Sequence, residues 1–417
     1  MFRSVLFAAL CVATPVLAQM RNVGPGVADR VSGETRGSLS SEVIIGGELA
    51  VTLQTDAIGR RAMRSAYADT YTQSQLATYL LLPGGFSINL VGRLEPADRE
   101  ATGRGQFFRD QTAWVDEFFL GYTWRWLDLA GGKIHPRFGS AWDRGPGLYG
   151  TDFGQRYELT EKLGVSARVW WSELAGITRQ WGSHNVLAEV FQADRSALST
   201  GLFSRRFAST RNVTDPDTGE VTTRSFLRFQ NSRRTGGADN ADFGGGTVIS
   251  AAGFGIPMPR GQAGYTVSYS SRRPGQDGVA SGRAGTEDGF SAGGFWTFPL
   301  PMRMIGAPFV EYARLSTADG FSGRSREYLT AGFDLRRAPW TFSYAYMNSS
   351  SRDREMDRPP RRGWAQQHTA SVTYDLYFVA PLPILPTASV TAGWRNLRED
   401  GRSANDFGAL VGWRLPF

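Results

Sequence analysis

The sequence contains almost no cysteine and almost no lysine. Its single cysteine is Cys11, close to the amino terminus, and its lysines are Lys133 and Lys162. The chain beyond Cys11 therefore has neither disulfides nor thiol chemistry, which excludes disulfide-stabilised scaffolds and cysteine enzymes. The formal net charge of +7 rests almost entirely on arginine, whose planar guanidinium stacks on aromatic rings and pairs with carboxylates.

Long apolar runs are missing as well. Beyond the amino-terminal segment, no window approaches the roughly 18 consecutive apolar residues that mark a membrane-spanning helix. The 50 glycines and the 12% of aromatic residues are typical of short twisted strands with aromatic girdles. The pI is near 9.7, but no basic stripe or basic helix is present, so we expect no nucleic-acid partner.

The amino terminus has the pattern of a secretory signal peptide. Arg3 supplies a positive charge, an apolar stretch follows, and small residues precede a cleavage site. This pattern predicts a signal peptide over residues 1–18 and export of the chain. Residues 19–40 are rich in Gly, Ser and Arg without periodicity, so we expect a flexible periplasmic segment. Residues 41–417 would then form one barrel domain.

This domain reads as a series of strands separated by turns or loops. The clearest alternation of apolar and polar side chains occurs in 42–54, 86–95, 113–124, 164–173, 185–193, 247–255, 264–271, 290–298, 308–315, 326–336, 340–347, 369–378, 388–397 and 406–417. Weaker candidates are 72–82, 126–134 and two arms near 198–208 and 222–230. The length allows about 24 residues per strand and connection for sixteen strands. We predict an all-β fold, a transmembrane antiparallel β-barrel of sixteen strands, with roughly 14 to 18 allowed.

Long and short connections alternate along the chain. The long polar ones, among them 137–163 and 398–405, are expected on the extracellular side. Short proline-containing turns such as 299–301 and 337–339 fit the periplasmic rim.

The alternation also predicts which charges face a wet interior. A charge that faces lipid costs about 2 to 4 kcal/mol at the membrane midplane, so charged positions within a strand belong on the lumen side. Four such side chains are predicted to face the lumen: Arg168, Asp334, Arg336 and Arg395.

The last strand has one apolar face that ends at Phe417. Counting back in twos gives Leu415, Trp413, Val411, Ala409 and Phe407, while Leu410 is the apolar exception on the other face. The strand resembles the closing strand of bacterial outer-membrane β-barrels, although Pro416 departs slightly from their usual pattern. The resemblance implies that the terminal aromatic is recognised by the barrel-assembly machinery. It makes Trp413, Leu415 and Phe417 the predicted assembly signal.

The most distinctive segment is 132–159, which begins Gly-Lys-Ile-His-Pro-Arg-Phe-Gly and continues with glycines, aromatic residues and charges. It resembles the segment of porins in which a strand end leads into a long charged loop. In general porins the third extracellular loop folds into the barrel and narrows it. The resemblance implies a pore constriction with charged residues Asp143, Arg144, Asp152, Arg156 and Glu158. An ordinary exposed loop with solvated charges remains the alternative.

Signals for enzymes and metal sites are weak. Residues 289–293 match the G-x-S-x-G pattern, but they lie in an alternating strand with no helix after it, unlike a nucleophile elbow. The histidines His135, His184 and His368 are far apart in the sequence and lack metal-ligand spacing, so surface or rim positions are expected. We expect no catalytic residues, no metal and no cofactor.

The sequence therefore predicts a porin in the outer membrane of a Gram-negative bacterium, open to passive diffusion of ions and small hydrophilic solutes. The resemblance implies a homotrimer in contact with outer-membrane lipid and lipopolysaccharide. A solute-selective channel for carboxylates, sugars or phosphate is the alternative within transport. Outside transport, the alternatives are an adhesin, an envelope anchor and an outer-membrane hydrolase.

Overall fold

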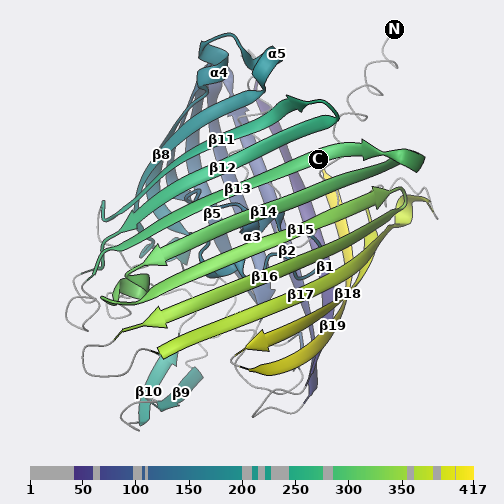
Figure 1. Ribbon diagram of the computed structural model, residues 1–417. Helices are drawn as coiled ribbons and strands as arrows, with labels where there is room; N and C mark the ends of the chain where they lie inside the picture. Colours follow the sequence, from purple (N-terminus) through teal and green to yellow (C-terminus); the bar gives the residue numbers. More distant parts are fainter. Residues whose placement is uncertain are drawn as a thin grey trace.

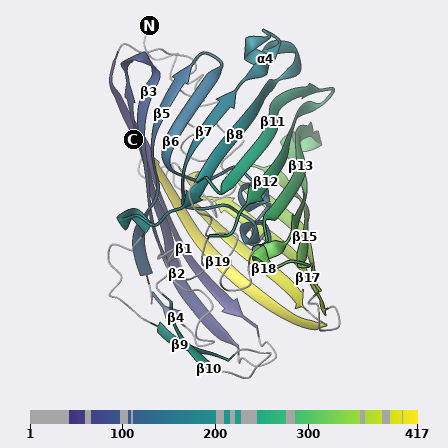
Figure 2. The ribbon, with the colours of Figure 1, turned by 90° about the vertical axis from the view of Figure 1, so that its left-hand side faces the viewer.

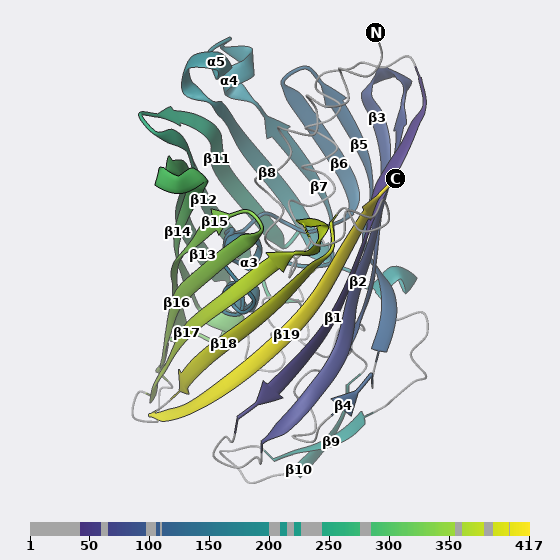
Figure 3. The same cartoon turned by 90° about the vertical axis from the view of Figure 1, so that its right-hand side faces the viewer.

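The computed structural model describes residues 42–59, 66–96, 106–108, 111–199, 209–214, 221–226, 244–275, 285–354, 361–378, 387–399 and 401–417. The predicted signal peptide and the segment 19–40 lie outside these residues. The main sheet closes on itself, because its first strand β1 (Ile44–Ile58) pairs along its length with its last strand β19 (Arg402–Pro416). Figures 1, 2 and 3 show the resulting barrel from three sides.

The barrel has sixteen antiparallel strands, which confirms the predicted fold class and strand number. Between β1 and β19 they are β2 (Tyr67–Leu82), β3 (Phe86–Pro96), β5 (Gln111–Trp124), β6 (Leu127–Ile134), β7 (Lys162–Val169), β8 (Ser183–Ala193), β11 (Gly246–Met258), β12 (Gly261–Arg272), β13 (Glu287–Leu300), β14 (Met304–Ser316), β15 (Ser325–Arg337), β16 (Trp340–Asp353), β17 (Arg361–Asp375) and β18 (Ser389–Glu399).

In the described part of the chain, three further strands lie outside this cycle. The short β4 (Gln106–Phe107) pairs with β2 in parallel, and β9 (Ser209–Thr214) forms a separate hairpin with β10 (Val221–Phe226). The weaker candidates 72–82 and 126–134 are barrel strands, whereas neither arm of the 198–230 region is, as far as the structure describes it.

Side chains alternate between the two faces of the wall as the sequence predicts. On β12, Tyr269 is 48% exposed on the outer face, while its neighbours Ser268 and Ser270 are buried on the inner face. The alternation is in register between adjacent strands, because the outward Tyr269 lies opposite the outward Phe290 of β13. An apolar exterior and a polar or small-residue interior suit a wall between lipid and water.

The connections differ at the two ends of the barrel. At one end the strands are joined by short turns such as Pro83–Gly85 and Pro301–Arg303, and at the other by longer segments. One exception at the short-turn end is a pair of one-turn helices between β7 and β8, α4 (Trp171–Leu174) and α5 (Thr178–Trp181) (Figure 1). Among the described residues, no helix is long and apolar enough to cross a membrane.

The prediction of a long loop over 398–405 is wrong. β18 continues to Glu399 and β19 begins at Arg402, so only two residues separate the two strands. The outward side chains here are polar, and Asn396 donates hydrogen bonds to Ser403 and Asn405 at 2.9 Å each. Polar side chains that pair across β18 and β19 continue the sheet beyond the apolar outer band. The polar composition of this segment therefore did not indicate a loop.

The connection between β6 and β7 runs inside the barrel. It carries the one-turn helix α3 (Ala141–Arg144) and the 3-10 turn Gly154–Arg156, and Figures 1 and 3 both place α3 within the ring of strands. Phe138, Phe153 and Tyr157 belong to the main buried apolar cluster, together with inward residues of β8, β11 and β14–β18. We call residues 135–161 the inward loop.

We predict that the carboxy-terminal residue controls assembly. The Phe417 N–H donates to the Gly47 carbonyl and the Gly47 N–H to the Phe417 carbonyl, each at 3.0 Å, while the phenyl ring is 59% exposed on the outside. Phe417→Asp should lower the amount of heat-modifiable barrel in membrane fractions sharply, because it places a charge at the closing seam. Met302→Asp, at an exposed turn residue, is the control. Normal barrel levels in Phe417→Asp would contradict the prediction.

Candidate functional site

Glu311 of β14 anchors the inward loop to the wall. Its side chain points into the lumen and is 1% exposed. Its carboxylate accepts hydrogen bonds from the Ser140 N–H at 2.6 Å, the Ser140 hydroxyl at 2.6 Å, the Ala141 N–H at 2.9 Å and the Tyr157 hydroxyl at 2.6 Å. A buried carboxylate is tolerable only when it is paired or well hydrogen-bonded, and here the loop supplies the donors.

The local sequence explains why the loop turns at this point. Gly139 has φ 72°, a left-handed conformation that glycine adopts without strain. The chain then enters α3, whose first free N–H groups point toward Glu311. A carboxylate at this position satisfies N–H groups that have no partner within the helix and interacts favourably with its dipole.

A second anchor joins the loop to the seam of the barrel. The hydroxyl groups of Tyr149 and Tyr71 each donate to the Asp56 carboxylate at 2.7 Å. Leu148 and Tyr149 pack on Leu410, the apolar exception on the inner face of the closing segment 407–417. The apolar exception in that strand therefore has a partner inside the barrel.

A third anchor is an ion pair. Asp152 accepts from Arg395 of β18 at 2.8 Å and from the Gln367 side-chain amide of β17 at 2.9 Å. Arg395 also pairs with Asp406 at 2.7 Å, and its guanidinium lies 4.6 Å from the centre of the Tyr149 ring. The charge of Asp152 is thus held against the wall.

Small residues on the wall leave room for the loop. A Cβ added to Gly332 of β15 would lie 2.6 Å from the Pro146 ring, and one added to Gly408 of β19 would lie against the Tyr149 hydroxyl. Ala313 and Ala345, on β14 and β16, are also fully buried. The loop therefore lies directly on the part of the wall from β14 to β19.

The structure does not bring the five predicted constriction residues together. Asp143 and Arg144 lie on α3 and line a cavity between the loop and the opposite wall. Asp152 is bound to Arg395 as described, and Arg156 lines a second cavity beside Arg326, Tyr328 and Ala365. Glu158 lies near the root of the loop, within electrostatic range of His135.

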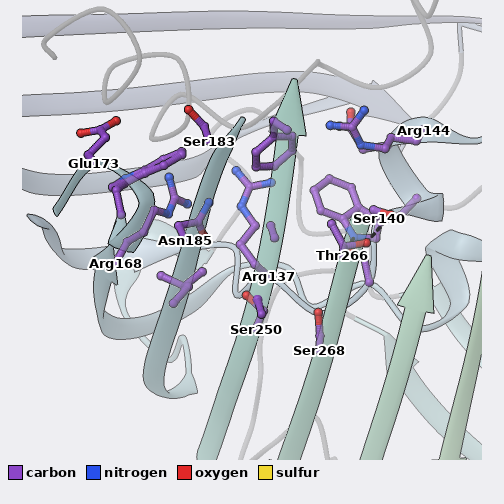
Figure 4. A pocket seen from close by; sticks show the side chains of 18 residues that line it. Arg137, Ser140, Arg144, Arg168, Glu173, Ser183, Asn185, Ser250, Thr266 and Ser268 are labelled. Carbon is purple, nitrogen blue, oxygen red and sulfur yellow. Dashed lines mark hydrogen bonds between the residues drawn. The ribbon is translucent and has the colours of Figure 1, made fainter. Parts of the chain in front are cut away.

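The first cavity has a volume of about 480 Å³. It lies between the loop and the wall formed by β7, β8, β11 and β12, toward the short-turn end (Figure 4). The loop contributes Arg137, Asp143 and Arg144, and β7 contributes Arg168. The remaining polar lining includes Glu173, Ser183, Asn185, Ser250, Thr266 and Ser268.

The predicted inner residues of β15 form a polar cluster of their own. Arg336 pairs with Asp334 at 3.0 Å, and Asp334 accepts a hydrogen bond from the Ser343 hydroxyl of β16 at 2.6 Å. This cluster lies near the short-turn end and is not part of the lining of either cavity.

The surface or rim position expected for His135 is wrong, since this side chain is 8% exposed and follows β6 at the start of the inward loop. His184 is also 8% exposed, but it lies at the short-turn rim, next to α4 and α5. His184 stacks on Trp171 with ring centres 4.9 Å apart. His135 lies 3.2 Å from Asp116 of β5, which also pairs with Arg93 of β3 at 2.6 Å. Inward charges on β3 and β5 therefore give His135 a network of partners that sequence spacing does not reveal.

The root of the loop contains two groups with shifted pKa values. Burial alone would lower the pKa of His135, but Asp116 and Glu117 outweigh it and raise this pKa to about 9. Burial raises the pKa of Glu158 to about 7, although His135 and Arg93 partly offset the effect. Near neutral pH, His135 is therefore positively charged while Glu158 is close to its titration midpoint.

Sequence reasoning missed wall residues that hold the loop, among them Glu311, Asp56, Gln367 and Glu189, whose carboxylate accepts a hydrogen bond from the Arg137 N–H at 2.6 Å. Glu311 carried a detectable signal, because it is a lone acidic residue between the outward Val310 and Tyr312 on an alternating strand. Asp56 and Gln367 also occupy inward positions in the alternation of their strands, β1 and β17.

Within the described residues, no group of three or more potential ligands could hold a metal ion. Ser291 of the G-x-S-x-G match is buried within β13, where the chain continues as a strand on both sides. Backbone geometry there differs from the strand-to-helix turn that a nucleophile elbow needs.

Comparisons with known proteins show what this chain is similar to. No model of a known protein family matches the sequence, and no curated protein matches it. Among solved structures, OprB of Pseudomonas putida has a TM-score of 0.56 at 11% identity, with 89% of this chain and 94% of that chain covered. OpdQ of Pseudomonas aeruginosa has a TM-score of 0.48 at 10% identity, covering 91% and 100% of the two chains.

The likeness to OprB concerns the fold. OprB is an outer-membrane porin, and the match covers nearly the whole of both chains. The chain therefore has the fold of the sixteen-stranded outer-membrane porins, as its closed antiparallel sheet also shows.

We predict that Glu311→Gln releases the inward loop. Hydrogen bonds to a charged group contribute about 1.5 to 3 kcal/mol each, and an amide cannot accept from all four donors. Limited trypsin digestion of the folded protein should then cleave after Arg144 or Arg156 at least several-fold faster. Glu327→Gln, on the outer face of β15, is the matched control. Equal cleavage rates in both variants would show that Glu311 does not hold the loop.

We also predict a charge change in the lumen near neutral pH. Because the pKa of Glu158 is raised to about 7, its carboxyl is neutral below this pH and gains a negative charge as the pH rises through it. Ion selectivity measured by reversal potential should move toward cations between about pH 6 and pH 8. Glu158→Gln should abolish this change. Persistence of the full shift in the variant would assign it to another group.

Proposed function

We propose that the protein is an outer-membrane porin: a water-filled channel for passive diffusion of ions and small hydrophilic solutes. The observation that carries this proposal is a closed barrel with a charged loop held inside it, beside a lined cavity. A structural plug would fill the lumen evenly. Here the loop is anchored to β8 through Glu189 as well as to β14 through Glu311, and it still leaves a lined cavity beside β7, β8, β11 and β12.

The constriction is the space between α3 and the wall of β7, β8, β11 and β12. Arg144 and Asp143 approach it from the loop, and Arg168 approaches it from the wall. With Arg137 and Glu173 included, the charged residues that line this space carry three positive and two negative charges. Fixed charges in a narrow wet passage bias which ions enter, and the arginine excess favours anions modestly.

Orientation and location follow from the same proposal. The short turns face the periplasm and the long connections face the outside of the cell, as in porins. The outer apolar face contacts outer-membrane lipid and lipopolysaccharide. Export by the signal peptide 1–18 and recognition of Trp413, Leu415 and Phe417 by the barrel-assembly machinery would bring the chain there.

We infer a homotrimer in the membrane. Besides the resemblance to porins, the outer face of β16 and β17 carries polar side chains: Tyr344 bonds His368 at 2.8 Å, and Gln366 donates to Tyr346 at 3.2 Å. Polar groups are costly in hydrocarbon, so a neighbouring copy suits this face better than lipid. Light scattering in mild detergent that found only monomer would contradict the trimer and leave the channel proposal unaffected.

Liposome swelling with sugars of graded size tests the channel itself. We expect the rate of swelling to fall smoothly with solute size. A protein that passes neither sugars nor ions would favour the alternatives outside transport: an adhesin, an anchor or a hydrolase.

Charge variants test where the constriction lies. Arg144→Gln and Arg168→Gln should each shift the reversal potential in a salt gradient toward cations, whereas Asp143→Asn should shift it toward anions. Both shifts should shrink at high salt, because the Debye length falls from about 30 Å at 0.01 M to about 3 Å at 1 M. Arg398→Gln is the control, since Arg398 lies over Trp364 on the outer face. Unchanged potentials in all three lumen variants would place the constriction elsewhere.

A further inference from the structure

The connection between β7 and β8 folds back over the outer face of the barrel wall. Trp171, the first residue of α4, stacks on His184 of β8 with ring centres 4.9 Å apart. Side chains two positions apart on a strand share a face, so His184 lies on the same face as Val186 and Val190. These two valines are 43% and 45% exposed on the outside of the barrel. The helix α4 therefore covers the outer face of the wall where the apolar band of β8 ends.

Hydrogen bonds hold α4 and α5 against the wall. The Ser172 hydroxyl accepts from the His184 N–H at 2.8 Å. The two ring nitrogens of His184 lie 3.1 Å from the Tyr265 hydroxyl of β12 and 2.8 Å from the Trp181 carbonyl of α5. Gly253 of β11 lies between His184 and Tyr265 in the sheet, and a Cβ added there would lie 2.8 Å from His184 Nδ1. The helix pair thus has a defined position at the short-turn end (Figures 1 and 3).

The helix pair leaves apolar side chains exposed beside the membrane-facing wall. Trp171 is 39%, Leu174 is 58% and Trp181 is 60% exposed. Exposed apolar side chains that gather on one small element indicate a contact with another molecule or phase. Tryptophan is enriched at the boundary between hydrocarbon and water, because its ring is apolar and its indole N–H needs a polar partner.

The exposed charges at this edge of the barrel are positive. Arg125 in the β5–β6 turn, Arg179 in α5 and Arg260 in the β11–β12 turn are all exposed. The nearby acidic residues Asp128 and Glu173 line cavities inside the barrel instead. A guanidinium binds phosphate through charged hydrogen bonds, and arginines close to a membrane surface are attracted to anionic lipid headgroups. Cationic and apolar side chains side by side therefore match a phospholipid layer, where phosphate groups lie next to acyl chains.

We propose that α4 and α5 lie in the phospholipid headgroup layer of the periplasmic leaflet and anchor this edge of the barrel there. The exposed apolar side chains contact the acyl chains, and the three arginines pair with phosphate groups. The lipid phase that contacts the outer face of β8 thus continues over the helix pair. A second copy of the chain is disfavoured here, because β13, β14 and β15 separate β12 from the strands proposed for contact between copies, β16 and β17. The inference rests on the proposed orientation, with the short turns toward the periplasm.

A fluorescent label reports the surroundings of the helix pair in the full-length protein. Cys11 is the only native cysteine, so a Cys11→Ser background allows a single introduced cysteine to carry the label. Gln180→Cys labels an exposed position of α5, and Met302→Cys labels an exposed turn at the same end of the barrel. The protein is reconstituted in vesicles of phosphatidylcholine and phosphatidylglycerol. We expect iodide in the water to quench the label at 180 several-fold less than the label at 302, and a lipid-borne nitroxide near the headgroups to quench it more.

Variants show which side chains make the contact. Leu174→Ser combined with Trp181→Ser should raise iodide quenching of the label at 180 to nearly the value at 302. The control is Trp340→Ser, which removes an exposed tryptophan from β16 at the same end of the barrel. Arg179→Gln combined with Arg260→Gln should remove the part of the shielding that depends on phosphatidylglycerol. Arg303→Gln, in the turn next to the reference label, should not.

Each other outcome overturns the inference in a recognisable way. Equal iodide quenching at the two labelled positions would place the helix pair in water, and this comparison needs none of the serine or glutamine variants. Shielding that survives the loss of both apolar side chains would assign it to the barrel wall. Energy transfer between labels at 180 on different copies would assign the surface to a second copy. The measurement does not depend on conduction, so a barrel that inserts but passes no ions would refute the channel and leave the lipid contact standing.

Discussion

The carboxylate of Glu311 is the interaction on which the interior of this barrel depends. It is buried in the lumen wall and accepts four hydrogen bonds from the inward loop. The hydrogen bonds satisfy both sides. The carboxylate loses its bound water on burial, and the N–H groups of Ser140 and Ala141 have no partner within α3. Their pairing sets the position of α3 and therefore the positions of Asp143 and Arg144 beside the cavity.

The inward loop divides the lumen unequally. From β14 to β19 the inner face has small residues where the loop passes, such as Ala345 and Gly408, and the loop packs onto them. On the other side, β7, β8, β11 and β12 contribute Arg168, Asn185 and hydroxyl groups that face the remaining space. The position at which Glu311 holds the loop, and not a change in the barrel itself, therefore determines where the cavity lies.

Much of the barrel could be predicted from the sequence, because strand alternation is a local signal. The phase of Phe407 to Phe417 and the inward direction of Asp334 follow from counting in twos. The interior could not be predicted in this way. Ser140 and its partner Glu311 are 171 positions apart, and Asp116 meets His135 only because β5 and β6 are neighbours. The short connection between β18 and β19 was missed for a different reason, since polar cross-strand pairs resemble a loop in composition.

The fate of the loop charges shows why residue type alone does not define a constriction. Asp143 and Asp152 are chemically identical and lie on the same loop, yet Asp152 is paired with Arg395 of the wall while Asp143 lines the cavity. The field in the passage therefore depends on which charges the wall already neutralises. Arginine has a further requirement, because its long side chain has many rotamers. Stacking Arg144 on Phe295 restricts this side chain and keeps its charge next to an apolar surface of the lumen.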